Sequence, residues 1–413
     1  MKEKKCLKLV VVLVQIFLIA CSNDDGGPVR SEIVLNHQSL ELEISDRDQL
    51  EVVNLLEGDA VEWSSEDESV VFVDVDGNLW AKESGSASIT ARVGELSATC
   101  SVTVNVGVFV TGYEYDNNTY TGMAKSWHND RVVDLGQDFA NAVSVFDGSV
   151  HVVGSMGTDG FTSTAKEWID GEAFDISGFG TYATAVDIVV NETKTYVLGQ
   201  VEGSMYSHIA IWEDGVITED IEGPRGVSPR GLHVQGNDVF VTGTEYNDNY
   251  VGIATYWKNG VAVPLSDKYS NAYAIYVDNG VVYVGGNEWD SETRNSVATL
   301  WVNGEPTYLT NALYDANIHD VTVVDGDWYA VGTVNNGSAR IAMMWRNGFS
   351  TDLSDGSVNT RAVAIQEFQG DIYVAGIVDD GTKKSGVIWK NGTVIRTMEA
   401  AVNDIILTDI LVK

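Results

Sequence analysis

Residues 362–398 of this chain read AVAIQEFQGDIYVAGIVDDGTKKSGVIWKNGTVIRTM. Four short apolar runs stand out, at 362–368, 372–376, 386–389 and 394–398, and turn-forming residues separate them. The last turn, Asn391-Gly392, begins two residues after Trp389. Asn-Gly between apolar runs is a strong hairpin signal, because both central positions of a type I′ turn need positive φ. This stretch therefore predicts a sheet of four antiparallel strands.

The same unit recurs along the C-terminal three quarters of the chain. Seven tryptophans lie 41, 44, 45, 44, 44 and 44 residues apart: Trp127, Trp168, Trp212, Trp257, Trp301, Trp345 and Trp389. Six of them are followed by Asn-Gly or Asp-Gly, and the first unit instead has Asn129-Asp130. In every unit an aromatic residue or histidine precedes a glycine by three positions: Phe109/Gly112, His151/Gly154, Tyr196/Gly199, Phe240/Gly243, Tyr283/Gly286, Tyr329/Gly332 and Tyr373/Gly376. A fixed period of this length indicates a repeat architecture.

Four strands in about 44 residues are typical of a β-propeller blade. The region from 107 to 413 starts at Val108 with the second strand of a unit, and its end, 408–412, parallels the inner strand at 186–190. We therefore expect an all-β protein with a seven-bladed propeller of four-stranded blades, in which the C-terminal strand closes the first blade and removes an open edge. Small residues three positions before most tryptophans predict blade-to-blade packing: Ala124, Ala165, Ala254, Ala298, Ala342 and Gly386. The blade resembles a Kelch blade, although the Kelch double glycine occurs only at Gly285-Gly286.

Residues 32–105 have the alternating pattern of short strands in a small β-sandwich. Apolar residues alternate with polar ones at Leu40/Leu42/Ile44, Val61/Trp63, Val71/Val73/Val75, Ala87/Ile89/Ala91 and Cys100/Val102/Val104. Trp63-Ser64-Ser65, Val73-Asp74, Gly77, Ala81, Gly85 and residues 87–91 resemble the group 2 bacterial immunoglobulin-like domain. That resemblance implies a spacer or an adhesive module, and we favour the spacer. We expect Trp63 and Cys100 to be core residues.

The N-terminus has the features of an export signal. Four lysines precede an apolar run at 9–20, which is too short to span a bilayer and suits a signal peptide at 1–20. Leu18-Ile19-Ala20-Cys21 resembles the lipobox of bacterial lipoproteins, which implies acylation of Cys21 and an outer-membrane anchor. Residues 21–31 would then form a flexible acidic tether. Its segment 22–27 resembles the export signal of surface lipoproteins of the Bacteroidetes, which implies exposure at the cell surface.

The charge and cysteine content argue against a nucleic-acid-binding protein and against a disulfide-stabilised fold. The formal net charge of −35 argues against nucleic acid as a partner, because such proteins present a basic face. There are three cysteines, and only Cys100 lies in the folded body, so no disulfide framework is expected. We expect a monomer whose partners are the membrane, through the lipid, and a glycan or protein ligand.

Candidate ligand-binding residues lie where the repeats differ. The predicted connections between second and third strands, at 113–120, 155–163, 244–250 and 287–295, vary in length and sequence, and variable loops on a rigid scaffold commonly bind ligands. Aromatic faces beside amides and carboxylates suit sugar rings. The aromatic candidates are Tyr113, Tyr115, Tyr120, Tyr246, Tyr250 and Trp289. Near the inner strands, and predicted to line the central mouth, are Arg230, His319 and Arg361, with Asn141, Asn271, Asp187, His233 and Asp409 beside them or further in.

The sequence favours a binding protein and leaves an enzyme open. We find no Gly-x-Ser-x-Gly elbow, no phosphate loop and no metal-ligand spacing among the six histidines, so we assign no catalytic or metal-binding residue. The acidic loops offer oxygen ligands that Ca²⁺ prefers, but they contain no EF-hand pattern, and no other cofactor is predicted. One alternative is a polysaccharide lyase or glycosidase that uses carboxylates at the mouth, Asp187 and Asp409 among them. Another is a structural subunit of a surface complex.

Overall fold

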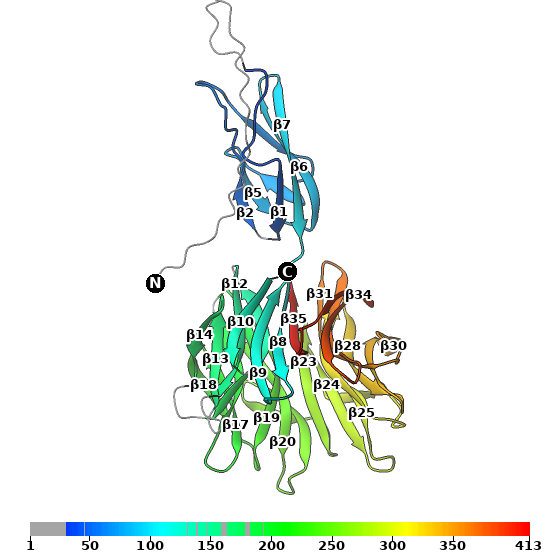
Figure 1. Cartoon of the computed structure of the whole chain (residues 1–413). Coiled ribbons are helices and arrows are strands. Elements are labelled where there is room, and N and C mark those ends of the chain that lie inside the picture. Colours follow the sequence, from blue (N-terminus) through cyan, green and yellow to red (C-terminus); the bar gives the residue numbers. More distant parts are fainter. Residues whose placement is uncertain are drawn as a thin grey trace, which may run out of the picture. The chain divides into compact units, whose positions relative to one another are not determined.

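The computed structural model describes residues 30–413, except 45, 130, 138, 147, 158–162, 178–181 and 193. The predicted signal peptide, Cys21 and most of the tether lie outside these residues. The described part is built of β-strands (Figure 1), and it contains no helix long and apolar enough to cross a membrane. The chain divides into two compact units. Among the described residues, the first contains 30–42 and 46–104, and the second contains 105–413 together with 43–44.

The first unit contains two small sheets. One has the order β1-β7-β6-β3, with β1 (Ser39–Glu43), β7 (Leu96–Asn105), β6 (Gly85–Val93) and β3 (Glu62–Ser65). The other has the order β2-β5-β4, with β2 (Arg47–Gln49), β5 (Asn78–Ala81) and β4 (Val71–Val73). The predicted alternation in β6 and β7 is confirmed, because Ile89, Ala91, Cys100 and Val102 are fully buried.

Two residues of this unit differ from expectation. Val75 was predicted to continue the strand of Val71 and Val73, but it is 85% exposed and lies beyond the end of β4. The strand ends there because the Asp74 carboxylate accepts hydrogen bonds from the backbone N–H groups of Asp76 and Asn78 and closes a turn. Trp63 is half-buried, and its ring covers Gly77 at that turn.

The second unit contains seven four-stranded sheets, which we number as blades 1 to 7, and the seven-bladed prediction is confirmed. Blades 1 to 3, each from the inner strand outward, are β35 (Asp404–Val412), β8 (Val108–Asp116), β9 (Thr121–His128), β10 (Arg131–Gln137); β11 (Phe139–Phe146), β12 (Ser149–Gly157), β13 (Ser163–Ile169), β14 (Glu172–Asp175); and β15 (Ala183–Val190), β16 (Thr195–Glu202), β17 (Ser207–Glu213), β18 (Val216–Ile221).

Blades 4 to 7 follow the same order, and Figure 1 shows the strands side by side. They are β19 (Val227–Gln235), β20 (Asp238–Tyr246), β21 (Gly252–Lys258), β22 (Val261–Pro264); β23 (Ser270–Asp278), β24 (Val281–Asp290), β25 (Asn295–Val302), β26 (Glu305–Tyr308); β27 (Ala316–Val324), β28 (Asp327–Asn335), β29 (Arg340–Arg346), β30 (Phe349–Asp352); and β31 (Asn359–Phe368), β32 (Asp371–Asp379), β33 (Lys384–Lys390), β34 (Thr393–Met398). In blade 1 the C-terminal strand β35 pairs with β8, as predicted.

The repeated tryptophans are packing residues. All seven are at most 4% exposed. Each belongs to a hydrophobic cluster that joins two neighbouring blades; for example, Trp168 of blade 2 packs with Phe109 and Ala124 of blade 1. The small residues before the tryptophans lie in these junctions, and a Cβ on Gly386 would come within 2.9 Å of Leu407 in the next blade. This confirms their predicted role in blade-to-blade packing.

The turn after each tryptophan ties three strands together. The first turn residue has a φ between 47° and 51° in every blade, and its side-chain oxygen accepts a hydrogen bond from the backbone N–H at the start of the second strand. The residues are Asn129, Asp170, Asp214, Asn259, Asn303, Asn347 and Asn391. The first unit lacks the glycine but keeps this asparagine, so its departure from the motif leaves the tie intact.

The glycine of the second strand has a steric explanation. Each inner strand carries a bulge, and just before it a backbone carbonyl points at the paired glycine. A Cβ on any of the seven glycines would lie 1.9–2.5 Å from that oxygen. For Gly286 the oxygen belongs to Asn271, and for Gly376 it belongs to Arg361. The glycine is therefore required wherever the bulge occurs.

The strands are longer than the sequence predicted. The predicted connection at 113–120 begins inside β8, and that at 244–250 begins inside β20. Tyr113, Tyr115 and Tyr246 consequently lie on strand ends, and Trp289 lies on β24. Polar residues at these ends were interpreted as loop residues because the apolar alternation stops before the backbone pairing does.

Candidate binding face and central channel

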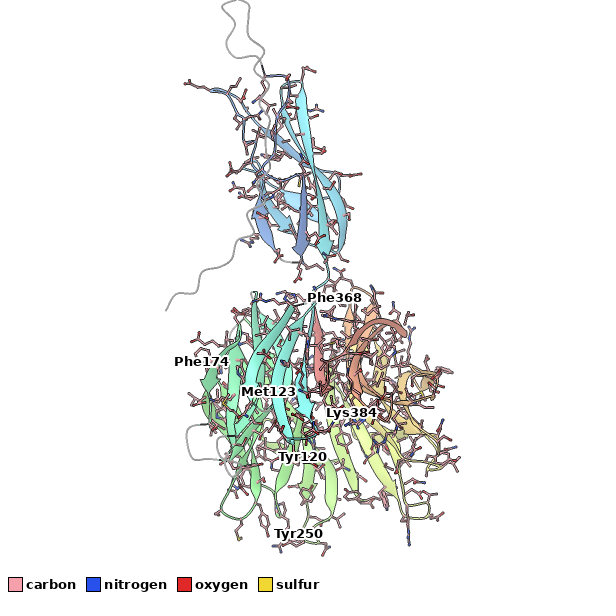
Figure 2. All side chains as sticks on the ribbon, in the orientation of Figure 1. Tyr120, Met123, Phe174, Tyr250, Phe368 and Lys384 are labelled. Carbon is pink, nitrogen blue, oxygen red and sulfur yellow. The ribbon has the colours of Figure 1, made fainter. Side chains whose placement is uncertain are left out.

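The two faces of the propeller differ in what they carry. The connections from second to third strand and from outer to inner strand lie on one face, which we call the loop face. The turns between the first and second strands and between the third and fourth strands lie on the other face, which we call the hairpin face. Figure 2 shows Tyr250, of the loop face, and Phe368, at an inner hairpin, at opposite ends of the propeller.

The inner strands surround a central cavity of about 350 Å³. The bulge residues of all seven inner strands line it, and five of them are polar, aromatic or ionisable: Asn141, Arg230, Tyr273, His319 and Thr408. His233 and Tyr276 lie further along the same strands, and their rings are 5.0 Å apart. The cavity is built from every blade. Of the residues expected near the mouth, Asn141, Asp187, Arg230, His233, His319 and Asp409 line it, whereas Asn271 and Arg361 are not among its lining residues.

Three aspartates directly after the bulges join blades across the cavity wall. Asp187 accepts hydrogen bonds from the N–H groups of Ile188 and, in the next blade, Leu232. Asp320 does the same with Val321 and Ile365, and Asp409 with Ile410 and Val143. All six N–O distances are 2.7–2.9 Å. In each blade that donates this N–H group, the residue directly after the bulge is small instead of an aspartate. These residues are Ala142, Gly231 and Ala364.

Burial disfavours the charged form of these carboxyl groups. It raises the pKa of Asp187 from 3.8 to about 8, and the nearby Asp409 adds to the rise. Burial also raises the pKa of Asp320 to about 7 and that of Asp409 to about 6. The backbone N–H groups act in the opposite direction in all three cases. Both oxygens of each group are occupied by backbone donors, so the geometry assigns these residues to blade-to-blade linkage.

An aromatic and cationic cluster lies on the loop face between blades 3 and 4. The Arg225 Nη1 atom donates to the Tyr206 hydroxyl at 2.9 Å, and its guanidinium carbon lies 5.1 Å from the ring centre of Tyr250. The two tyrosine hydroxyls are 3.3 Å apart. The Asp248 carboxylate is 3.6 Å from Arg225, and the Tyr250 ring is 64% exposed. Of this cluster, only Tyr250 was a sequence candidate.

A second group of aromatic side chains lies between blades 4 and 5. Tyr269 and Trp289 meet edge to face with ring centres 6.4 Å apart, and they are 47% and 37% exposed. A Cβ on Gly252 would come within 3.5 Å of both the Tyr246 and Tyr269 rings, so the absence of a side chain there lets the rings approach. Tyr246 and Trp289 are therefore brought into one region with Tyr269, which the sequence did not single out.

The candidates of blade 1 lie apart from these two groups. Tyr113 is half-buried and packs edge to face on Phe139 of blade 2, with ring centres 4.7 Å apart. Burial raises the pKa of Tyr113, and the positive charge of Arg361 partly counters that rise. Tyr115 contacts Tyr113, and Tyr120 is 77% exposed. Tyr113 is thus mainly a packing residue, whereas Tyr120 is available to a ligand.

Most polar loop residues form turns rather than an open ligand set. Asp116 accepts a hydrogen bond from Asn118, Asn247 from Asn249, and Asp290 from Thr293. Among the residues that the structure describes, no group of three or more histidine, cysteine, aspartate or glutamate side chains could hold a metal ion.

Glu288 is buried on the loop face and is fully engaged. It accepts hydrogen bonds from Ser266 at 2.6 Å, Tyr308 at 2.8 Å and Lys268 at 3.1 Å. Burial alone would raise the pKa of Glu288, but these three donors outweigh it and hold that pKa below its usual value. The network fixes the connection that precedes β23 and so supports Tyr269 and Trp289.

The comparisons with known proteins concern the architecture. Residues 33–104 match the bacterial immunoglobulin-like domain (group 2). No curated protein matches the chain.

Similar solved structures include the β-propeller domain of the Trilobed protease from Pyrococcus furiosus, with 12% identity, 77% of this chain and 96% of that chain covered, and a TM-score of 0.46. They also include an acylaminoacyl peptidase from Pyrococcus horikoshii, with 11% identity, coverage of 77% and 51%, and a TM-score of 0.46. A third is a putative TolB from Agrobacterium tumefaciens, with 13% identity, coverage of 60% and 89%, and a TM-score of 0.38. Because these similarities are low, the blade assignment rests on the strand pairing itself.

Proposed function

We propose that this chain is a non-enzymatic binding protein that is anchored at the bacterial cell surface and binds a glycan through the loop face of its propeller. The observation that carries the proposal is the group of solvent-exposed aromatic rings on that face, at Tyr250, Tyr269 and Trp289, with the half-buried Tyr206 beside Tyr250. Exposed aromatic faces beside fixed hydrogen-bonding groups suit the apolar faces and hydroxyl groups of sugar rings.

The anchoring part of the proposal is supported by the sequence. A lipobox-like segment ends at Cys21, and an acidic stretch follows it. The immunoglobulin-like unit fits a spacer between the lipid and the propeller. Treatment of intact cells with a protease tests surface display, since complete protection of the protein would contradict it.

Glycan binding is tested with full-length protein on a glycan array, followed by titration calorimetry with the best ligand. Tyr250→Ala should weaken binding about tenfold, because loss of one stacking ring removes roughly 1 kcal/mol or more. Phe349→Ala is the matched control, since Phe349 is 81% exposed and lies at a hairpin of the opposite face. An array without signal, together with capture of a protein ligand, would replace the glycan with a protein in this proposal.

A polysaccharide-cleaving enzyme is the second candidate, and one observation favours it. Asp187, Asp320 and Asp409 line one cavity, and carboxyl groups with raised pKa values can act as general acids. Turnover of a polysaccharide by the purified protein, abolished by Asp187→Asn in a variant of unchanged fold, would establish this alternative. The engagement of both carboxylate oxygens by backbone donors favours the binding protein.

A further inference from the structure

The arginines of the propeller are unevenly placed. It has eight: Arg131, Arg225, Arg230, Arg294, Arg340, Arg346, Arg361 and Arg396. Five of these, Arg225, Arg230, Arg294, Arg340 and Arg361, lie in connections or at strand ends of the loop face. In a chain with a net charge of −35, most of the propeller's few arginines thus lie on one face, among acidic residues.

Three of these guanidinium groups are not neutralised by a partner. Arg230, Arg340 and Arg361 form no ion pair with an acidic side chain of the described residues, whereas Arg346 on the hairpin face binds Asp327 at 2.6 Å. Arg230 and Arg361 are both exposed. An exposed arginine without an acidic partner, in a protein rich in acids, keeps all five N–H donors for a ligand.

These arginines belong to one arc around the mouth of the central cavity. Arg230 lies close enough to Tyr273 to lower the pKa of that phenol against the effect of burial. The Tyr273 ring is 5.9 Å from the His319 ring, and His319 lies next to Arg361 in turn. Burial lowers the pKa of the Arg361 guanidinium, and Arg340 lies close enough to Arg361 for its charge to lower that pKa further. The arc thus runs through blades 4, 5, 6 and 7.

The rest of the mouth provides neutral hydrogen-bonding groups. Burial and the charge of Arg361 lower the pKa of His319 to about 4, so its ring is neutral at neutral pH. Its Nε2 atom is 3.2 Å from the Thr333 hydroxyl. A chain of amides links blades 5 and 6: Asn271 donates to Asn287 at 3.2 Å, and Asn287 donates to Asn317. The three aspartates of the cavity wall are bonded to backbone N–H groups and form no ion pair with Arg230 or Arg361.

From this arrangement we propose that the glycan bound by the loop face is an anionic polysaccharide, and that Arg230 and Arg361 hold a carboxylate or sulfate group of one of its residues at the cavity mouth. This inference rests on the proposed glycan-binding function. Guanidinium groups bind such anions through paired N–H donors, and adjacent rings can pack on the sugar that carries the anion. At physiological ionic strength the Debye length is about 8 Å, so salt should weaken the attraction between these arginines and an anionic ligand.

The test measures binding of full-length protein to immobilised polygalacturonate and chondroitin sulfate, and to the carboxyl-reduced or desulfated form of each polymer. The wild-type protein should bind an acidic polymer at least tenfold more tightly than its neutral form, and added salt should weaken that binding. Arg230→Gln and Arg361→Gln should each weaken it about tenfold, because a hydrogen bond to a charged group contributes about 1.5–3 kcal/mol. Arg361→Lys keeps the charge and should lie between wild type and Arg361→Gln.

The control is matched to the loop-face double variant, in which Arg230→Gln and Arg361→Gln are combined, and it removes the same number of charges at different positions. Arg131→Gln combined with Arg346→Gln removes two arginines from the hairpin face and should leave binding unchanged. Equal binding of the acidic and neutral forms would overturn this inference while leaving the glycan-binding function standing. Equal loss in the loop-face and hairpin-face pairs would overturn the assignment to the mouth. Absence of binding to every polymer, and to a general glycan array, would overturn the proposed function as well.

Discussion

The Asp187 carboxylate of blade 3 accepts a hydrogen bond from the backbone N–H of Leu232 in blade 4, with an N–O distance of 2.7 Å. The same oxygen–amide bond recurs from Asp320 to Ile365 and from Asp409 to Val143. Three of the seven blade junctions are thus linked through an aspartate side chain. Its position in the cavity wall alone would suggest a catalytic acid.

Replacement of such an aspartate should lower stability. In Asp187→Asn the amide nitrogen cannot accept a hydrogen bond, so one buried N–H loses its partner, and unfolding should become easier by about 1–3 kcal/mol. Chemical denaturation followed by tryptophan fluorescence measures the change. Asp352→Asn, at an exposed position of β30, is the control and should behave as wild type. Unchanged stability of Asp187→Asn would contradict the linking role.

The same carboxyl groups predict how stability depends on pH. Because their folded-state pKa values, about 8, 7 and 6, exceed the ordinary value of 3.8, the folded chain holds protons that the unfolded chain has lost. Their contribution to stability is therefore present at low pH and is lost as the pH rises from about 4 to about 8. The melting temperature should fall between pH 5 and pH 8.5, and this fall should be smaller in Asp187→Asn. An identical slope in the variant would contradict the titration of Asp187.

A glycine paired with a bulge should tolerate no side chain. In Gly286→Ala the new Cβ would lie 1.9 Å from the Asn271 carbonyl oxygen, so the bulge must move or the strands must separate. We expect a loss of more than about 3 kcal/mol, at the upper end of the effects of single substitutions. Gly304→Ala is the comparison, because that site is open but has a φ of +86°, and it should cost about 1 kcal/mol. Similar losses at both sites would argue against the steric explanation.

The network around Glu288 should matter for binding as well as stability. Glu288→Gln removes the charge that Lys268 and Tyr308 share and should destabilise the protein by about 1–3 kcal/mol. Because this network supports Tyr269 and Trp289, glycan affinity should fall too, and fluorescence titration measures it. Glu305→Gln, at an exposed position of β26, serves as the control. Normal affinity in a destabilised Glu288→Gln protein would separate the network from the binding face.

The architecture was predictable because it repeats. Each blade repeats the same glycine and tryptophan, and six blades repeat the Asn-Gly or Asp-Gly turn. The strands of the first blade could therefore be predicted from the other six copies despite its irregular Asn129-Asp130. Val75 shows the limit of this reasoning, since apolar alternation continued past a turn that Asp74 closes.

The candidate site was less predictable because it occurs once. Arg225 and Tyr206 lie 19 positions apart and meet only when the outer-to-inner connection of blade 3 is in place. Asp320, which plays the same part as Asp187 and Asp409, could have been found from its place two residues after Ile318, where the inner strands of blades 1 and 3 carry their aspartates.

The pairing of β8 with β35 has a consequence for the order of folding. Thr111 and Thr408, whose hydroxyl groups are 3.2 Å apart, are separated by 297 positions in the chain. Until β35 arrives, β8 presents an unpaired edge, and such edges pair readily with other chains. Contacts between residues so distant in sequence form slowly, because the intervening chain must be ordered first. Closing the ring is therefore the folding step at which this protein is most exposed to misassembly. The longer β8 stays unpaired, the larger the fraction of protein that should be lost to pairing with other chains.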